Sequence, residues 1–354
     1  MRRLSSTVAR LTALRKGMLP SSAGSSRLTA TAFSPNPGAL VAKTYIPANL
    51  PPGAPLVVVL HGCTQDASLY DRGSGWSQLA DRHGFALLFP EQERANNFNL
   101  CFNWYQAADA RRGRGEAASI AAMIAHVTKA HQLDPARVFI NGLSAGGAMT
   151  MVMLACYPEL FAGGAIIAGL PFAVAEGTPD ALEAMRGQSL PSRRALAASI
   201  ASASDHGGPW PTLSVWHGTA DHVVSSANAG AIVDQWRDRI GLGTVEGEQD
   251  RVDGQRHTIW RDSKGKIAIE RYDIAGMGHG TPLATRGGED CGQAGPHMLE
   301  AGICSTSRLA ESWGIATGAK GPRQPAPHLT PPVTTPTGVG AVIEDALRAA
   351  GLMR

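Results

Sequence analysis

The 354-residue chain contains no hydrophobic run that approaches the roughly 18 residues of a membrane-spanning helix. It also lacks the Gly-X-Y period of collagen and the heptad repeats of a coiled coil. A wholly disordered chain is excluded as well, because 44% of the residues are hydrophobic and only 17% are charged. What remains is a globular protein with a sizeable core, in which 41 glycines and 23 prolines predict many loops.

Cysteine is scarce, and its spacing excludes several kinds of site. The five cysteines include no C-x-x-C pair, so neither a zinc site nor a thioredoxin-like site is expected. The sequence also contains no nucleotide-binding loop and no flavin motif. We therefore expect no metal and no cofactor.

Acidic residues are absent before Asp66, so the mildly basic net charge of +3 comes from the N-terminal part of the chain. The basic residues in that part are Arg2, Arg3, Arg10, Arg15, Lys16, Arg27 and Lys43. In the rest of the chain the acidic residues outnumber the basic ones, which does not suit a phosphate backbone. We expect no nucleic-acid partner.

Residues 1–40 are expected to form a basic arm and an irregular lead-in. Apolar residues in the arm recur at spacings of three and four, which indicates an amphipathic helix. Basic residues interrupt every stretch that could serve as a secretory signal, so we expect a cytoplasmic protein, with secretion as the alternative. The helix is expected to dock on the domain, and the alternatives are binding to a lipid or polymer granule and a targeting role.

From residue 41 to 320 the sequence alternates between strand and helix patterns, which predicts one α/β domain with a mostly parallel central sheet flanked by helices. Strands are expected at 56–62, 85–90, 137–141, 162–170, 212–218, 257–262 and 266–274. Helices are expected at 76–83, 116–131, 148–157 and 226–240, with a helical insertion at 173–208. Residues 321–354 are expected to form a Pro/Thr-rich tail with a short helix at 341–350.

The strongest chemical signal is the G-x-S-x-G motif at 142–146, which follows a predicted strand and precedes a predicted helix. A serine on such a tight turn projects its hydroxyl, and small neighbours permit the strained backbone. The helix that starts after it directs backbone N–H groups and a positive dipole end at the same place. Ser144 is therefore the predicted nucleophile.

A serine nucleophile needs a histidine base within hydrogen-bond reach. His279 fits this role, because glycines flank it in a loop that follows the strand at 266–274. His297, in a later loop, is the alternative base.

The acid of the triad is expected after a strand that lies between the serine and the histidine in the chain. Asp221 follows the strand at 212–218 and meets this condition. The weaker candidates are Asp205, Asp234 and Asp273.

Ester hydrolysis also requires donors for the oxyanion of the transition state. One expected donor is the N–H of Ala145, next to the nucleophile, and the other is the N–H of Cys63, after the first central strand. His61 in the same loop is expected to brace that loop beside the substrate rather than to act as a base.

Six motifs in order relate this chain to a known family: VVVLHGCTQ, CFNWY, GLSAGGAM, WHGTADHVV, GMGHG and GPHMLEAGI…SWG. From about residue 41 to 316, the chain resembles the polyhydroxybutyrate depolymerase-like esterases. These have an α/β-hydrolase fold and are related to feruloyl and acetyl-xylan esterases. The resemblance implies a triad of Ser144, Asp221 and His279, with an oxyanion donor from the loop that contains Cys63.

The resemblance further implies a disulfide between Cys63 and Cys101 beside the oxyanion loop, and a substrate-pocket wall formed by Trp104. The alternative is two reduced thiols and a tryptophan that only packs. A second pairing, Cys291 with Cys304, is also suggested.

The function implied is a serine carboxylesterase that hydrolyses short-chain polyhydroxyalkanoate, such as poly-3-hydroxybutyrate, or its oligomers. The alternatives are a feruloyl or acetyl-xylan type of esterase and a non-catalytic protein that binds polyester granules through the basic arm. The short tail leaves no room for a polymer-adsorbing domain, so we expect soluble oligomers, amorphous granules or short acyl esters as substrates.

Overall fold

The structure, a computed structural model, describes residues 26–286 and 291–316. It is built on a ten-stranded sheet with the strand order β1-β2-β4-β3-β5-β6-β7-β10-β9-β8. The strands of this sheet are β1 (Thr29–Thr31), β2 (Val41–Tyr45), β3 (Leu56–Leu60), β4 (Ala86–Glu91), β5 (Val138–Leu143), β6 (Gly163–Ile167), β7 (Thr212–Gly218), β8 (Glu248–Val252), β9 (Gln255–Arg261) and β10 (Ile267–Ile274). A separate parallel pair joins β11 (Thr281–Leu283) to β12 (Met298–Glu300).

The six central strands, β4, β3, β5, β6, β7 and β10, are parallel to one another. The strands outside them, β1 and β2 at one edge and β9 and β8 at the other, pair antiparallel. The strands at the centre of the sheet are apolar because both of their faces are covered, as β3 illustrates. All five residues of β3 are buried. Leu56, Val58 and Leu60 face one hydrophobic core, whereas Val57 and Val59 face the other. A strand covered on both faces can thus be a continuous aliphatic run.

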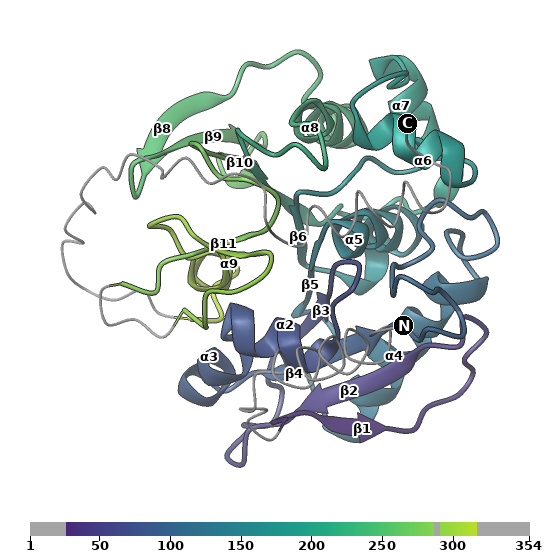
Figure 1. The fold of residues 1–354 in the computed structure, drawn as a ribbon, viewed down its shortest axis with the longest axis vertical. Coiled ribbons are helices and arrows are strands. Elements are labelled where there is room, and N and C mark those ends of the chain that lie inside the picture. Colours follow the sequence, from purple (N-terminus) through teal and green to yellow (C-terminus); the bar gives the residue numbers. More distant parts are fainter. Residues whose placement is uncertain (1–25, 287–290, 317–354) are drawn as a thin grey trace, which may run out of the picture.

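Helices cover both faces of the sheet (Figure 1). They are α2 (Ala67–Ser74), α3 (Trp76–His83), α4 (Gly115–Ala130), α5 (Ala145–Cys156), α6 (Thr178–Met185), α7 (Arg193–Ala203), α8 (Ala227–Arg239), α9 (Ser305–Ser312) and the 3₁₀ helix η1 (Pro158–Leu160). The core beneath α2, α3 and α9 is separate from the core beneath α4, α5 and α8. Within the described ranges, no helix is both long and apolar enough to cross a membrane.

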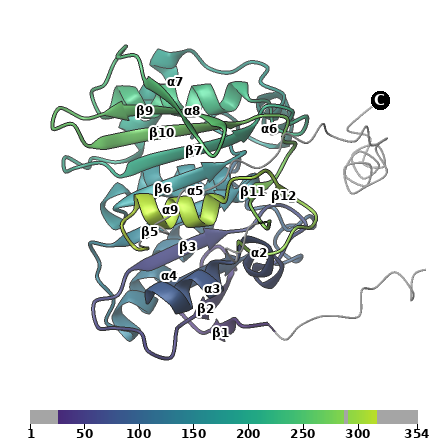
Figure 2. The same ribbon diagram turned by 90° about the vertical axis from the view of Figure 1, so that its left-hand side faces the viewer.

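The carboxyl ends of the central strands share one edge of the sheet, where the segments that follow them gather. α2 follows β3, α6 follows β6, and β11 follows β10 along the chain. Figure 2 shows α2, α6, β11 and β12 on the same side of the molecule. In parallel sheets this edge is where ligands bind.

α5 approaches the sheet more closely than any larger residue would allow at its first turn. All twelve of its residues are buried. A Cβ added to Gly146 would lie 2.4 Å from the carbonyl oxygen of Leu60 and 2.5 Å from that of His61. A Cβ on Gly142 would lie 2.3 Å from the carbonyl oxygen of Gly146. The two glycines of the G-x-S-x-G motif therefore bring the start of α5 against the end of β3.

The structure confirms the α/β architecture and most of the predicted elements. β7 covers the predicted range, α3 matches the predicted helix, and β9 and β10 lie at the strands expected at 257–262 and 266–274, where they pair antiparallel. The prediction of an irregular lead-in up to residue 40 is wrong for β1, which pairs with β2 and extends the sheet. β1 was missed because its three residues are too few to show the alternating pattern of a strand. The predicted arm, up to residue 25, and the predicted tail from 321 lie outside the described residues.

Replacing Gly146 by alanine is expected to lower the free energy of unfolding by about 1–3 kcal/mol, although alanine favours helix, because the methyl group meets two backbone carbonyls. Gly207→Ala is the matched control, because nothing lies within 4 Å of its added Cβ. Chemical denaturation should show a change of less than about 0.5 kcal/mol for the control. Equal stability of the two variants would contradict the close approach of α5 to β3.

Candidate active site

Ser144 lies between β5 and α5 in a backbone conformation that few residues adopt. Its φ is 57° and its ψ is −118°, and its N–H donates to the carbonyl oxygen of Ile167 at 2.9 Å. Such strain persists only where the surroundings enforce it. Here the close contacts at Gly142 and Gly146 hold both ends of the turn. The serine is therefore presented at the carboxyl edge of the sheet, at the N-terminus of a buried helix.

Asp221 and His279 are brought together at the same edge from two adjacent strands. Asp221 follows β7 and His279 follows β10, and β7 pairs with β10 in parallel. The distance from His279 Nδ1 to Asp221 Oδ2 is 2.8 Å. Because an ionised carboxylate only accepts hydrogen bonds, Nδ1 carries the proton and Nε2 is left as the basic nitrogen.

The surroundings of Asp221 favour its ionised form. Burial alone would raise the pKa of Asp221, but the hydrogen bond and the positive charge of His279 and the N–H of Val224 together hold it below its ordinary value. The other carboxylate oxygen, Oδ1, accepts the N–H groups of Val223 and Val224 at 2.8 and 2.9 Å. The carboxylate is thus fixed in orientation and charged at neutral pH.

Two of the alternative acids are engaged elsewhere. Asp273 pairs with Arg271, its Oδ1 lying 2.7 Å from Nη2, and Asp234 lies 3.5 Å from Arg237. Arginine partners match the charge of these two carboxylates, whereas Asp221 has a histidine partner.

His297, the alternative base, lies behind His279 rather than in its place. Its Nδ1 is 3.2 Å from the carbonyl oxygen of His279, and the two rings meet edge to face with centroids 5.8 Å apart. Burial lowers the pKa of His297, which favours a neutral ring whose Nδ1–H donates to that carbonyl. This supporting position was missed from the sequence, since spacing alone cannot separate a base from a residue that braces it.

The expected oxyanion donors lie on the two segments that meet at Gly146. Ala145 is the first residue of α5, so its N–H has no acceptor within the helix. Cys63 follows β3, and among the described residues no hydrogen-bond acceptor pairs with its N–H. The neighbouring N–H groups are engaged, that of Gly62 by the Gln65 side chain and that of Thr64 by the carbonyl oxygen of Asn99. These bonds hold the loop in place, and the Cys63 N–H between them is unpaired in the described residues.

His61 is a buried residue that braces this loop, and its place beside the substrate stays a prediction. The residue is 1% exposed, and the Gln92 N–H donates to its Nε2 at 3.1 Å. Nδ1 then carries the proton and donates to the carbonyl oxygen of Gly62 at 2.8 Å. Burial lowers the pKa of His61, in keeping with a neutral ring. Neither ring nitrogen is left for a substrate.

The described part of the chain contains two disulfides. Cys63 is bonded to Cys101, which ties the oxyanion loop to the loop that carries Trp104. Cys291 is bonded to Cys304, which joins the segment before β12 to the start of α9. Cys156 is free and buried in α5.

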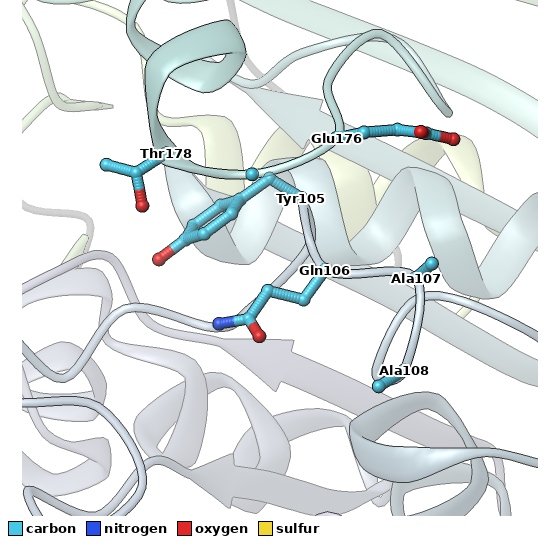
Figure 3. Close-up of a pocket in the computed structure, with 7 residues that line it drawn as sticks. Tyr105, Gln106, Ala107, Ala108, Glu176 and Thr178 are labelled. Atoms are coloured by element: carbon cyan, nitrogen blue, oxygen red, sulfur yellow. The ribbon is translucent and has the colours of Figure 1, made fainter.

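A surface hollow of about 500 Å³ lies beside the Trp104 loop (Figure 3). It is lined by Tyr105, Gln106, Ala107, Ala108, Glu176, Gly177 and Thr178. Figure 3 shows the Glu176 carboxylate pointing away from Tyr105. Trp104 does not line this hollow, since it is 7% exposed and packs edge to face on Tyr105. No residue of the predicted triad lines it either, so the hollow is separate from the serine.

The fold, with its serine turn and its Asp–His pair at the carboxyl edge of the sheet, defines an α/β hydrolase. The acetyl xylan esterase from Aspergillus awamori has the same fold, with a TM-score of 0.69, 23% identity, and coverage of 82% of this chain and 99% of that one. The family model described as esterase PHB depolymerase matches residues 43–259. The chain belongs to this family and is a hydrolase that acts on ester bonds.

Named relatives cover most of the chain. Poly(3-hydroxyalkanoate) depolymerase C of Paucimonas lemoignei is 40% identical over 286 residues, which are 80% of this chain and 69% of that protein. Acetylxylan esterase A of Aspergillus oryzae is 32% identical over 273 residues, 73% of this chain and 85% of that protein. Feruloyl esterase B of Talaromyces stipitatus is 30% identical over 274 residues, 75% of each chain.

Because the pKa of Asp221 is lowered in the folded protein, its ionisation should stabilise the fold in a pH-dependent way. This contribution is complete above the unfolded-state pKa of about 4 and is lost as the pH falls through the lower folded-state pKa. Asp221→Asn should therefore lose less unfolding free energy than the wild type between about pH 6 and about pH 2. Asp234→Asn, at a more exposed carboxylate, is the control and should follow the wild type. If the unfolding free energy of Asp221→Asn depended on pH as it does in the wild type, a lowered pKa of Asp221 in the folded protein would be contradicted.

Proposed function

We propose that this esterase hydrolyses short-chain poly(3-hydroxyalkanoate), such as poly-3-hydroxybutyrate, or its oligomers, through an acyl-enzyme on Ser144. The observation that carries the chemistry is the 2.8 Å contact between Asp221 and His279 at the sheet edge that also presents the strained Ser144. The substrate class is supported by the 40% identity to the Paucimonas depolymerase.

In the first half of the reaction, His279 Nε2 removes the proton from the Ser144 hydroxyl while its oxygen bonds to the ester carbonyl carbon. The carbonyl oxygen becomes an oxyanion, which accepts hydrogen bonds from the N–H groups of Cys63 and Ala145. The ionised Asp221 stabilises the imidazolium through the Nδ1 hydrogen bond. The bond to the alcohol oxygen then breaks, and His279 returns the proton to that oxygen.

In the second half, water attacks the acyl-enzyme carbonyl carbon and gives its proton to His279 Nε2. The same two N–H groups hold the second oxyanion. Its collapse breaks the bond to Ser144, which takes back the proton from His279 and releases the acid. The hydrolysis thus consumes one water for each ester bond and needs no redox partner.

Feruloyl or acetyl-xylan ester hydrolysis is the second candidate, favoured by the relatives at 30% and 32% identity. It uses the same three side chains, so only the substrate distinguishes the two. Granule binding through the basic arm and a cytoplasmic location remain predictions, since the arm up to residue 25 lies outside the described residues. The Trp104 pocket wall also remains a prediction.

Ser144→Ala is expected to lower ester turnover at least about 10³-fold, because the hydroxyl that forms the acyl-enzyme is gone. The measurement is the release of 3-hydroxybutyrate from soluble oligomers and amorphous granules, beside p-nitrophenyl acetate and methyl ferulate. Ser214→Ala, at a buried serine on β7, is the matched control for loss of a hydroxyl. The Ser214 hydroxyl accepts the Trp216 Nε1–H at 2.8 Å, away from the proposed chemistry, so this variant should keep its turnover where it is folded.

The substrate panel separates the candidates. Serine-dependent release from the hydroxybutyrate substrates would support the proposal. Turnover of ferulate or acetyl esters alone would move the function to polysaccharide esters, and full activity of Ser144→Ala would remove the proposed nucleophile.

A further inference from the structure

Glu116 carries a buried carboxyl group that the proposed reaction does not use. It lies in the first turn of α4 and is 0% exposed. Four amide N–H contacts reach it. Oε1 accepts from Gln92 Nε2 at 2.6 Å, from Asn103 Nδ2 at 2.8 Å and from Asn96 Nδ2 at 3.2 Å. Oε2 accepts the backbone N–H of Asn103 at 2.8 Å.

These donors all belong to the loop between β4 and Trp104, so Glu116 organises a segment of residues 92–103. Burial raises the pKa of Glu116 to about 8, and the charge of Asp109 adds to this, although the bonds from Asn103 and Gln92 oppose it. A carboxyl group buried at such a cost is expected only where its geometry matters. Without the carboxyl group, the backbone N–H of Asn103 would lose its acceptor. Gln92 Nε2 and Asn96 Nδ2 would keep only their other acceptors, among them the carbonyl oxygens of Cys101 and Gly38.

Two routes lead from Glu116 to the proposed oxyanion donor, and both pass through Gln92. The Gln92 side chain donates to Glu116 and also to the carbonyl oxygen of Cys101 at 3.0 Å. Cys101 is bonded to Cys63 through the disulfide. The Gln92 backbone N–H donates to His61 Nε2, and the His61 ring is hydrogen-bonded to the Gly62 carbonyl, one residue before Cys63.

We propose that Glu116 is a positioning residue that sets the direction of the Cys63 N–H through Gln92, Cys101 and His61. The inference rests on the proposed function, in which that N–H holds the oxyanion. Because the N–H acts on the transition state rather than on the bound ester, an error in its direction lowers kcat more than it raises KM. If Glu116 had a purely structural role, its replacement would lower the stability of the protein but would not lower kcat selectively over KM.

Glu116→Gln is the test variant, because it keeps the size of the side chain and replaces one accepting oxygen by an NH₂ group. That NH₂ opposes at least one of the N–H donors of Gln92 and Asn103. The expected result with p-nitrophenyl acetate is a fall in kcat of about tenfold, less than the roughly 10²–10³-fold loss for a donor removed outright. KM should change by less than about twofold.

A second readout reports the oxyanion directly. A trifluoromethyl ketone analogue adds to a serine nucleophile and leaves an alkoxide in the oxyanion position, so its affinity should fall by the same factor as kcat/KM. Glu270→Gln is the matched control. Glu270 is a buried carboxylate on β10 that contacts His257 and Tyr272, and neither partner belongs to the proposed site. Its variant should keep the wild-type kcat at a temperature where it is folded.

If Glu116→Gln does not fold, Gln92→Met provides the same test, because it removes the amide that joins Glu116 to Cys101. Either variant should show a lower kcat and a lower affinity for the trifluoromethyl ketone. Unchanged kcat and analogue affinity in a folded variant, or an equal loss in Glu270→Gln, would overturn the role of Glu116. If Ser144→Ala turned over the ester as fast as the wild type, the proposed function would fail as well. The Ser144→Ala result therefore distinguishes failure of the proposed function from failure of the Glu116 role alone.

Discussion

The contact between the first turn of α5 and the end of β3 is the constraint on which the site depends. A backbone-to-backbone approach this close requires glycine at 146, and the tight turn before it requires glycine at 142. The result is a strained Ser144 between them. The same contact places the start of α5 beside the residues that lead to Cys63. One packing constraint thus brings the proposed nucleophile and both proposed oxyanion donors to one place.

The opposite side of the site is organised by sheet register rather than by close packing. β7 and β10 run parallel, with His217 of β7 opposite Asp273 of β10. The loops that follow these strands carry Asp221 and His279, which meet at 2.8 Å. Behind them, His297 contacts the His279 carbonyl, and the N–H groups of Val223 and Val224 hold Asp221. The proposed acid and base are therefore already in contact in the absence of an ester, as preorganised catalysis requires.

The sequence was informative where local pattern and chemistry coincide. Aliphatic runs such as β3 could be predicted because a strand buried on both faces must be apolar. Ser144, Asp221 and His279 could be proposed as a set because each follows a recognisable strand, and the structure brings the last two into contact. β1 is too short to show a period, and β8 is exposed and polar, so neither was predicted. The roles of Glu116 and His297 depend on contacts between distant segments, and the sequence near them carries no signal of those contacts.

The covalent intermediate offers the most direct test of the proposed mechanism. The protein would be mixed with a 3-hydroxybutyrate oligomer, quenched with acid during turnover, digested and analysed by mass spectrometry. A hydroxybutyryl ester is expected on the peptide that contains Ser144, with no adduct in Ser144→Ala. Ester turnover without any adduct, or an adduct on another residue, would contradict the mechanism.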